Sequence, residues 1–315
     1  MKKVLGIFLA LAVLCGAAAL GAIPASAGGS DSELYGAYSY GDLTYSIYHD
    51  DWETKENPYI VIMYSPDASG DVVIPSSIDG LPVKEMFFVF YGNENITSVQ
   101  IPDSVEWIST DTFSGRSSLT ADNVFLSPSN PYLMFSDGFL IRKQDMNLIV
   151  YIGDSANPSV PEGVKSLGSQ AFSSRYRGVN FASITLPSTL EGFDGVPIVY
   201  CDDLKITIPE SVKTISSDWI FYGCKNVVVT IPRDTTIGNP FDPDEEVFVF
   251  GNCENPTIMG YAGSSAESYA RELGINFVEI QPQIQAKVLF WNSWPSWAQA
   301  MLRYVLFGWL WERWL

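Results

Sequence analysis

The side chains that could catalyse a reaction are few in this sequence of 315 residues. The single histidine, His49, is a candidate general base or metal ligand, because imidazole titrates near neutral pH. It lies beside Asp50 and Asp51 in a predicted turn, where an exposed structural residue is the simpler interpretation. The 36 acidic residues offer pairs that a hydrolase could use, but no nucleophile elbow, metal motif or phosphate loop accompanies them. We therefore expect a non-catalytic protein without a cofactor.

The densest acidic run is Asp242-Pro-Asp-Glu-Glu246, which could bind calcium through several carboxylates. It lacks the glycine and the ligand spacing of an EF-hand loop, so we prefer to interpret it as a solvated loop. The formal net charge of the chain is −18. A strongly acidic protein repels phosphate backbones, and nucleic acid is therefore not an expected partner.

A sequence repeat supplies the elements that would position any functional side chain. An apolar residue precedes each of six prolines, and in five of the six units another aliphatic residue lies three positions before the proline. This period of two indicates a short strand with one buried face, and proline, which has no N–H, should end it. Further apolar residues follow three, six and eleven positions after the first five prolines. The six prolines are Pro75, Pro102, Pro161, Pro187, Pro209 and Pro232.

A unit of this length cannot bury its apolar side alone, so the units should stack and align their strands in a parallel sheet. The prolines are 27, 59, 26, 22 and 23 residues apart, and the long interval must contain an insertion. At about 124–158, two apolar runs, Phe139–Arg142 and Leu148–Ile152, flank a polar turn, which predicts a hairpin. We expect this hairpin to project from the stack as a contact surface.

The repeats resemble the BspA-like class of bacterial leucine-rich repeats. The sequence motif on which the resemblance rests is clearest in Ile101–Phe113 (IPDSVEWISTDTF) and Ile208–Ile220 (IPESVKTISSDWI). Val72–Val83 is similar to the first repeat of that family, and Met259–Ile280 to its closing cap. The resemblance implies a solenoid, α/β to mainly β, with short parallel strands in one sheet, an N-terminal hairpin cap and a strand–helix–strand C-terminal cap. It implies surface binding or adhesion, and it brings no catalytic residues.

The predicted organisation begins with a secretory signal at residues 1–27, because two lysines, an apolar stretch and Ala25-Ser26-Ala27 follow in order. A linker and a β-hairpin cap follow at 28–70, in which aromatic alternation predicts two strands joined near Asp50–Asn57. The repeats occupy 71–256 and the C-terminal cap 257–280. A linker at 281–293 leads to a hydrophobic, Trp-rich helix at 294–315.

Cys201, Cys224 and Cys253 fall near the ends of successive repeats. Zinc is a poor fit, because there is no Cys-x2-Cys motif and the histidine is remote. Equivalent positions in stacked repeats lie about 5 Å apart, within disulfide range. Three thiols allow at most one bridge within the chain. Because cysteine is among the most buried residue types, we prefer a ladder of reduced thiols, and one disulfide remains an open alternative.

The final segment differs from the repeats, since six of the nine tryptophans lie between Trp291 and the last residue. A helix with a wide aromatic face suits a membrane interface, whereas a full span would place Arg303 in lipid at a cost of about 2.5–3.5 kcal/mol. Docking on the repeats and self-association are the alternatives. No LPxTG-like sorting motif is present. The expected contact residues are Trp294, Trp297, Arg303, Trp309, Trp311 and Trp314.

Strand positions that point away from the core precede the prolines by even numbers of residues. They should form a ladder of mostly small, neutral and hydroxyl-bearing side chains, which suits broad, polar, low-affinity contact with a protein. The competing interpretation is that such residues simply suit exposed strand positions. The candidate ligand-binding residues are Ser98, Gln100, Ser183, Thr185, Lys205, Thr207, Val228 and Thr230.

Three functions follow in order of preference from these observations. The first is a secreted, surface-associated, adhesin-like protein that binds an extracellular protein or a cell-surface partner. The second is a structural spacer of the cell envelope without a specific ligand. The third is a hydrolase based on paired carboxylates.

Overall fold

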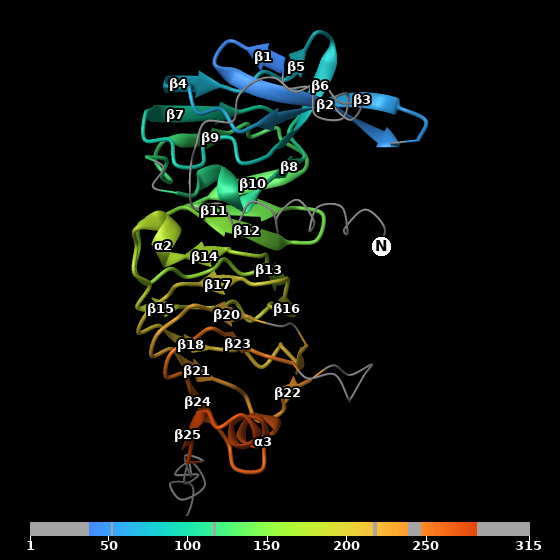
Figure 1. The fold of residues 1–315 in the computed structure, drawn as a ribbon. Helices are drawn as coiled ribbons and strands as arrows, with labels where there is room; N and C mark the ends of the chain where they lie inside the picture. Colours follow the sequence, from blue (N-terminus) through green and yellow to red (C-terminus); the bar gives the residue numbers. More distant parts are fainter. Residues whose placement is uncertain (1–37, 52, 116–117, 217–218, 239–246, 282–315) are drawn as a thin grey trace, which may run out of the picture. The chain divides into compact units, whose positions relative to one another are not determined.

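The computed structural model describes residues 38–51, 53–115, 118–216, 219–238 and 247–281 (Figure 1). The predicted signal segment at 1–27, the acidic run Asp242–Glu246 and the Trp-rich segment at 294–315 lie outside these residues.

Each of the later repeats contributes short strands to three parallel sheets, here called sheets I, II and III (Figure 1). Sheet I contains the strands predicted before the prolines and the two strands of the cap: β15 (Ser183–Ile184), β18 (Lys205–Thr207), β21 (Val228–Thr230), β24 (Thr257–Gly260) and β25 (Asn276–Glu279). Sheet II contains β13 (Ser166–Leu167) and β16 (Gly192–Phe193). It is continued next to β16 by β19 (Thr214–Ile215) and β22 (Thr236–Ile237), which pair with each other. Sheet III contains β14 (Phe172–Ser173), β17 (Ile198–Val199), β20 (Phe221–Tyr222) and β23 (Phe250–Gly251).

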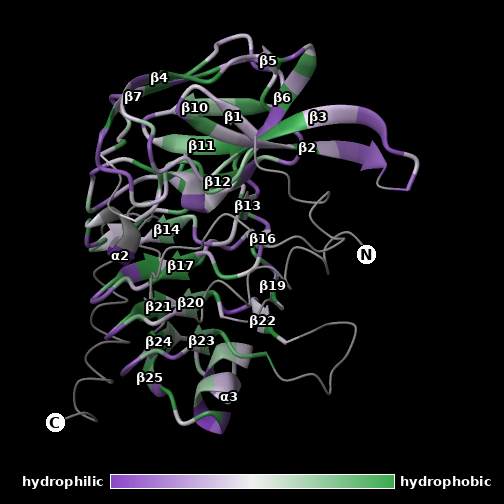
Figure 2. Cartoon of the chain, turned by 45° about the horizontal axis from the view of Figure 1, so that its top comes forward, coloured by the Kyte–Doolittle hydropathy of each residue, from purple (hydrophilic) through white to green (hydrophobic). Residues whose placement is uncertain are grey.

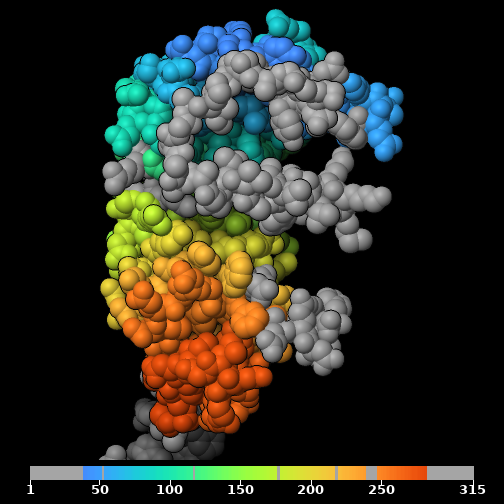
Figure 3. All heavy atoms as spheres, viewed as in Figure 1, coloured from blue at the N-terminus to red at the C-terminus, as the bar shows by residue number. Residues whose placement is uncertain are grey.

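The predicted fold class, a mainly β repeat with stacked parallel strands, is confirmed, but three parallel sheets replace the single expected one. After Pro161 and Pro187, the two additional sheets arise at the apolar residues six and eleven positions later. Leu167 lies in β13 and Phe172 in β14, and both side chains are fully buried. Strands of two residues show no alternation that a sequence pattern could reveal. In Figure 3 these repeats appear as successive bands from yellow to red. Units that follow one another in the sequence therefore lie next to one another in the stack.

The N-terminal part is closed by the predicted hairpin cap, which is confirmed. β2 (Leu43–Asp51) and β3 (Glu56–Met63) pair in antiparallel fashion, and β3 pairs in parallel with the first repeat. This sheet includes β1 (Tyr38–Tyr40), β5 (Ser77–Ile78), β6 (Leu81–Met86) and β8 (Trp107–Ile108). A separate three-stranded sheet contains β4 (Gly70–Val73), β7 (Ile96–Ile101) and β9 (Val124–Leu126).

The expectation that the insertion projects from the stack is wrong. Its strands, β10 (Leu133–Ser136), β11 (Phe139–Arg142) and β12 (Asn147–Tyr151), join sheet II, because β12 pairs in parallel with β13. Both faces of β12 are buried. The hairpin therefore serves as a layer of the stack, and its continuous apolar run reflects a strand that is covered on both sides.

The core consists of two clusters of buried apolar side chains, and the insertion contributes to both. Leu140 and Ile149 belong to the N-terminal cluster, whereas Phe139 and Leu148 belong to the C-terminal one. β10 and β11 are largely green in Figure 2, as expected for strands that separate two apolar cores.

The C-terminal cap has the predicted strand–helix–strand order: β24, α3 (Ser265–Glu272) and β25 (Figure 1). Ser264 is the N-cap of α3, and its Oγ accepts a hydrogen bond from the backbone N–H of Glu267. The other helical elements of the described residues are the turn-length α2 (Ser174–Arg177) and the 3-10 helix η1 (Thr110–Phe113).

Asp111 in η1 gives the first testable prediction. Burial raises the pKa of the Asp111 carboxyl to about 6 from its ordinary value of 3.8. Between about pH 4 and pH 6 the folded chain therefore binds more protons than the unfolded chain, and stability falls as the pH rises. We expect Asp111→Asn to increase the free energy of unfolding by about 1–3 kcal/mol at pH 7, with almost no change at pH 4.

Urea unfolding of Asp111→Asn at pH 4 and pH 7 measures this difference. Asp122→Asn, which changes an exposed carboxylate, is the matched control and should leave the pH dependence unaltered. An Asp111→Asn variant with the same loss of stability from pH 4 to pH 7 as the parent chain would contradict the prediction.

Candidate interaction surfaces

Six of the eight predicted ladder residues lie together on sheet I. Ser183, Lys205 and Val228 are register partners in one row, and Thr207 and Thr230 are partners in the next. Thr185 follows β15 and forms a parallel bridge with Ser159. The side chains of Thr185, Lys205 and Thr207 are exposed, and those of Ser183, Val228 and Thr230 are half-buried.

The expectation that Ser98 and Gln100 continue this ladder is wrong. Both lie on β7, in the separate sheet with β4 and β9. The insertion is stacked between β9 and the later repeats, so the two strand surfaces do not join in one sheet. The Ser98 hydroxyl is also occupied, because its Oγ donates to Asp71 Oδ1 at 2.7 Å.

Sheet II carries a hollow of about 800 Å³, which we call the polar groove and which the sequence did not predict. Ser166 on β13, Gly192 on β16 and Thr214 on β19 line it from three successive repeats. Ser166 and Gly192 are register partners. Gly192 explains the hollow, because a Cβ added there would meet no atom within 4 Å.

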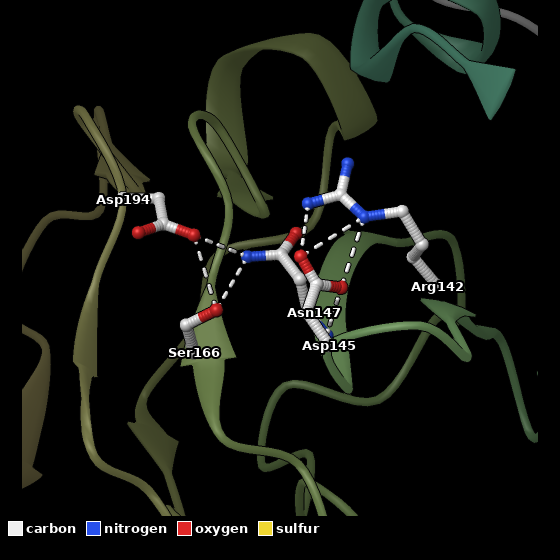
Figure 4. Close-up of polar contacts among 5 residues, drawn as sticks. All are labelled: Arg142, Asp145, Asn147, Ser166 and Asp194. Atoms are coloured by element: carbon white, nitrogen blue, oxygen red, sulfur yellow. Dashed lines mark hydrogen bonds and ion pairs between the residues drawn. The ribbon is translucent and has the colours of Figure 1, made fainter.

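One rim of the polar groove is held by Asn147, a buried residue at the start of β12 (Figure 4). Its Nδ2 donates to Ser166 Oγ at 2.6 Å and to Asp194 Oδ2 at 2.7 Å. Ser166 Oγ donates to the same Asp194 oxygen at 3.1 Å. Figure 4 shows the other oxygen of Asp194 pointing away from Asn147. Two donors therefore fix a carboxylate whose second oxygen can accept from a ligand.

Beside this network, Arg142 and Asp145 form a bidentate pair across the turn from β11 to β12 (Figure 4). Arg142 Nε donates to Asp145 Oδ1 at 2.9 Å, and Nη2 donates to Oδ2 at 2.6 Å. The hydrogen bond from Arg142 lowers the pKa of the Asp145 carboxyl, and the same bond raises the pKa of the guanidinium. Both groups therefore stay charged at neutral pH.

The polar groove is also lined by charges of alternating sign at Lys165, Glu191 and Lys213, each four residues after its proline. Lys165 Nζ lies 3.0 Å from Glu191 Oε1, and both side chains are more than half exposed. An exposed ion pair contributes only about 0–1 kcal/mol to stability. A ligand of complementary charge can therefore replace one partner at little cost.

The polar groove is suited to recognition by hydrogen bonds and charge. Among the described residues no group of three or more His, Cys, Asp or Glu side chains is arranged to hold a metal ion. The expectation that His49 is an exposed turn residue is wrong, because His49 lies within strand β2, opposite Pro58 of β3, and is half-buried.

The three cysteines stack in successive repeats as free thiols, two of them buried. Cys224 Sγ accepts a hydrogen bond from the backbone N–H of Cys201 at 3.3 Å, and Cys253 Sγ donates to Gly251 O at 3.4 Å. Hydrogen bonds with the neighbouring thiols, followed by burial, raise the pKa of Cys224. This thiol therefore remains protonated and unreactive at neutral pH.

The predicted contact residues of the Trp-rich segment, Trp294, Trp297, Arg303, Trp309, Trp311 and Trp314, lie outside the described residues. In the part of the chain that the structure describes, no helix is long and apolar enough to cross a membrane.

Fold and surfaces together define a repeat protein whose stacked strands present extended polar faces. Residues 85–130 and 152–240 match the family model of the BspA type leucine rich repeat region, in six copies. In these residues the repeats match the BspA type, in agreement with the resemblance that the sequence predicts. No curated protein has a matching sequence.

Several solved structures are similar to the chain. A leucine-rich repeat protein from Eubacterium ventriosum is 18% identical with a TM-score of 0.39, and the match covers 60% of this chain and 56% of that one. The chain thus spans little more than half of that protein. A leucine rich repeat protein from T. pallidum is 20% identical (TM-score 0.30, 76% and 97% covered). A leucine rich cell surface protein from Faecalibacterium prausnitzii is 16% identical (TM-score 0.28, 74% and 97% covered).

Proposed function

We propose that this is a non-catalytic repeat protein that acts at the cell surface or outside the cell by binding another protein. The repeat family and the signal-like residues 1–27 support this location. The observation that carries the binding proposal is the polar groove, where Gly192 leaves a hollow between the hydroxyls of Ser166 and Thr214. The alternative function is a spacer of the cell envelope without a specific ligand.

The partner of the polar groove is a polypeptide segment that carries both acidic and basic side chains. Lys213 can pair with a carboxylate of such a segment, and Asp194 can accept a hydrogen bond or pair with a cation. Ser166 and Thr214 can bond to its amides. Because Asn147 and Arg142 hold their neighbours in place, little side-chain entropy is lost when the segment binds.

Gly192→Tyr tests this proposal by filling the hollow from its floor. The new side chain meets no atom within 4 Å at its Cβ, so we expect the variant to fold normally. Peptides selected from a displayed random library against the parent chain should bind Gly192→Tyr at least about tenfold more weakly, a loss of about 1.4 kcal/mol. Surface plasmon resonance with the selected peptides measures the difference.

Thr207→Tyr is the matched control, because it adds the same ring to an exposed strand position of sheet I. If the selected peptides bind Gly192→Tyr with unchanged affinity but bind Thr207→Tyr more weakly, binding belongs to the ladder on sheet I and the groove proposal is overturned. A library that yields no peptide for the parent chain would favour the spacer.

A further inference from the structure

A second hollow, of about 600 Å³, lies at the C-terminal cap, and we call it the cap pocket. It is lined by the last strand of sheet III and by the segment that joins α3 to β25. Phe248, Phe250 and Leu273 supply its apolar surface, and Cys253 and Tyr269 also line it. Unlike those of the polar groove, the described residues that line it include no lysine, aspartate or glutamate.

The cap pocket exists because sheet III ends before its core side chains are fully covered. Within the described residues β23 pairs only with β20, so its outer edge faces the pocket. Phe250 stacks on Phe221 with ring centroids 5.4 Å apart, and it is only partly buried. Helix α3 closes part of this edge, where Tyr269 Oη accepts from the backbone N–H of Val249 at 2.8 Å.

The apolar rim of the cap pocket is largely exposed. Phe248 is 42% exposed and Leu273 is 43% exposed. Trp219, whose backbone N–H donates to Phe248 O, is 47% exposed beside them. Terminal repeats need a cover for their core edge, and contiguous exposed apolar surface marks a contact site. We therefore expect an apolar segment to cover this rim.

The chain itself continues with such a partner within reach of the cap pocket. Asn276 lines the pocket, and the last described residue, Gln281, follows it by five positions, about 17 Å along a strand. Residues 282–293 can span up to about 40 Å, enough to bring Trp294 back to the pocket. A tether of this length holds the segment at an effective concentration of order mM, so even a weak contact would form.

Charge favours the same occupant. Residues 282–315 contain three basic side chains, Lys287, Arg303 and Arg313, and one acidic side chain, Glu312, in a chain of formal net charge −18. The cap presents the exposed carboxylates of Glu272 and Glu279 near the point where the chain continues. The basic residues can therefore lie against acidic surface while the tryptophans enter the apolar pocket.

We propose that the Trp-rich segment 291–315 folds back on its own chain and packs into the cap pocket against Phe248, Phe250 and Leu273. The segment then completes the cap of the repeat stack. The proposal is independent of the polar groove, which lies on sheet II.

A cysteine scan of the segment tests the contact directly in the full chain. Cys253 lines the pocket and is half-buried, so a cysteine placed at Trp294, Trp297 or Trp309 should form a disulfide with it under an added disulfide oxidant. We expect at least one of Trp294→Cys, Trp297→Cys and Trp309→Cys to give an intramolecular bridge that mass spectrometry maps to Cys253. Combining that change with Cys253→Ser should abolish the bridge. Bridges only between two chains would assign the pocket to a second copy, and the absence of any bridge would also overturn the proposal.

Protection from trypsin gives a second, independent readout. Cleavage after Lys287 and Arg303 should be at least about tenfold slower in the parent chain than in Leu273→Arg, because proteolysis follows the population of the undocked segment. Val73→Arg is the matched control, since Val73 is also an exposed apolar residue, at 59%, and lies outside the pocket. Equal cleavage rates in the parent chain and Leu273→Arg would overturn the proposal. So would protection that appears only when anionic phospholipid vesicles are added.

Discussion

Replacing Asn130 with alanine is expected to lower the free energy of unfolding by about 3–5 kcal/mol, the largest loss that we predict for a single polar side chain. Asn130 is buried and makes four hydrogen bonds to the backbone. Its Nδ2 donates to Pro102 O at 3.0 Å and Val105 O at 2.8 Å. Its Oδ1 accepts from Tyr132 N at 2.9 Å and Leu133 N at 2.7 Å.

These bonds join the turn after Pro102 to the start of the insertion, so Asn130 fastens the insertion to the preceding repeat. Alanine would leave four backbone groups without these partners, and each buried group that stays unsatisfied costs about 1–3 kcal/mol. Relaxation and water entry should recover part of the sum. Guanidinium unfolding followed by circular dichroism measures the loss.

Asn95→Ala is the control for Asn130→Ala. Asn95 is exposed, and its φ is not positive, so alanine is not strained there. We expect this variant to change stability by less than about 0.5 kcal/mol. A loss below about 1 kcal/mol for Asn130→Ala would show that the four backbone groups find other partners, and the assigned role of Asn130 would be wrong.

The second large effect is expected at Gly138, in the tight turn between β10 and β11. Ser136 and Phe139 are register partners, and the two residues between them, Asp137 and Gly138, have φ values of 52° and 83°. Two successive positive φ values identify the hairpin turn that favours Asp-Gly. A Cβ on Gly138 would also lie 2.6 Å from the backbone nitrogen of Gly153.

Gly138→Ala should therefore lower the free energy of unfolding by about 2–5 kcal/mol, from backbone strain plus a steric clash in a packed region. Gly80→Ala separates the two causes, because Gly80 has a φ of 81° and a Cβ there would meet nothing within 4 Å. We expect Gly80→Ala to cost only about 1 kcal/mol. Equal losses for the two variants would mean that the approach of Gly138 to Gly153 does not constrain the fold.

Both large effects concern the insertion. The sequence predicted that it projects from the stack, whereas the structure places it within the stack. The sequence indicated two strands there but missed β10, although Asp137-Gly138 is a recognisable hairpin signal. It also placed the hairpin outside the stack. Burial of both faces of β12 makes the insertion a shared layer of the two core clusters.

The polar groove shows a second limit of sequence reasoning. A signal was present, because Lys165, Glu191 and Lys213 each lie four residues after a proline of successive repeats. Alternating charges at one repeat position indicate a shared exposed surface once the stacking is known. The hollow itself depends on Gly192 and on Asn147 from the insertion, which meet only in the folded chain.

The sequence by itself determined the repeat, the family of its units, the hairpin cap and the strand–helix–strand cap. These features follow from local patterns: the period of two before five of the six prolines, the missing proline N–H and the aromatic alternation of the hairpin cap. Only the tertiary structure decided that the later repeats form sheets I, II and III, that Ser98 and Gln100 lie apart from the other ladder residues, and where the groove and the cap pocket lie. Those features depend on which strand pairs with which across an insertion, and pairing between distant strands is set by the packing of buried side chains, which leaves no regular period in the sequence.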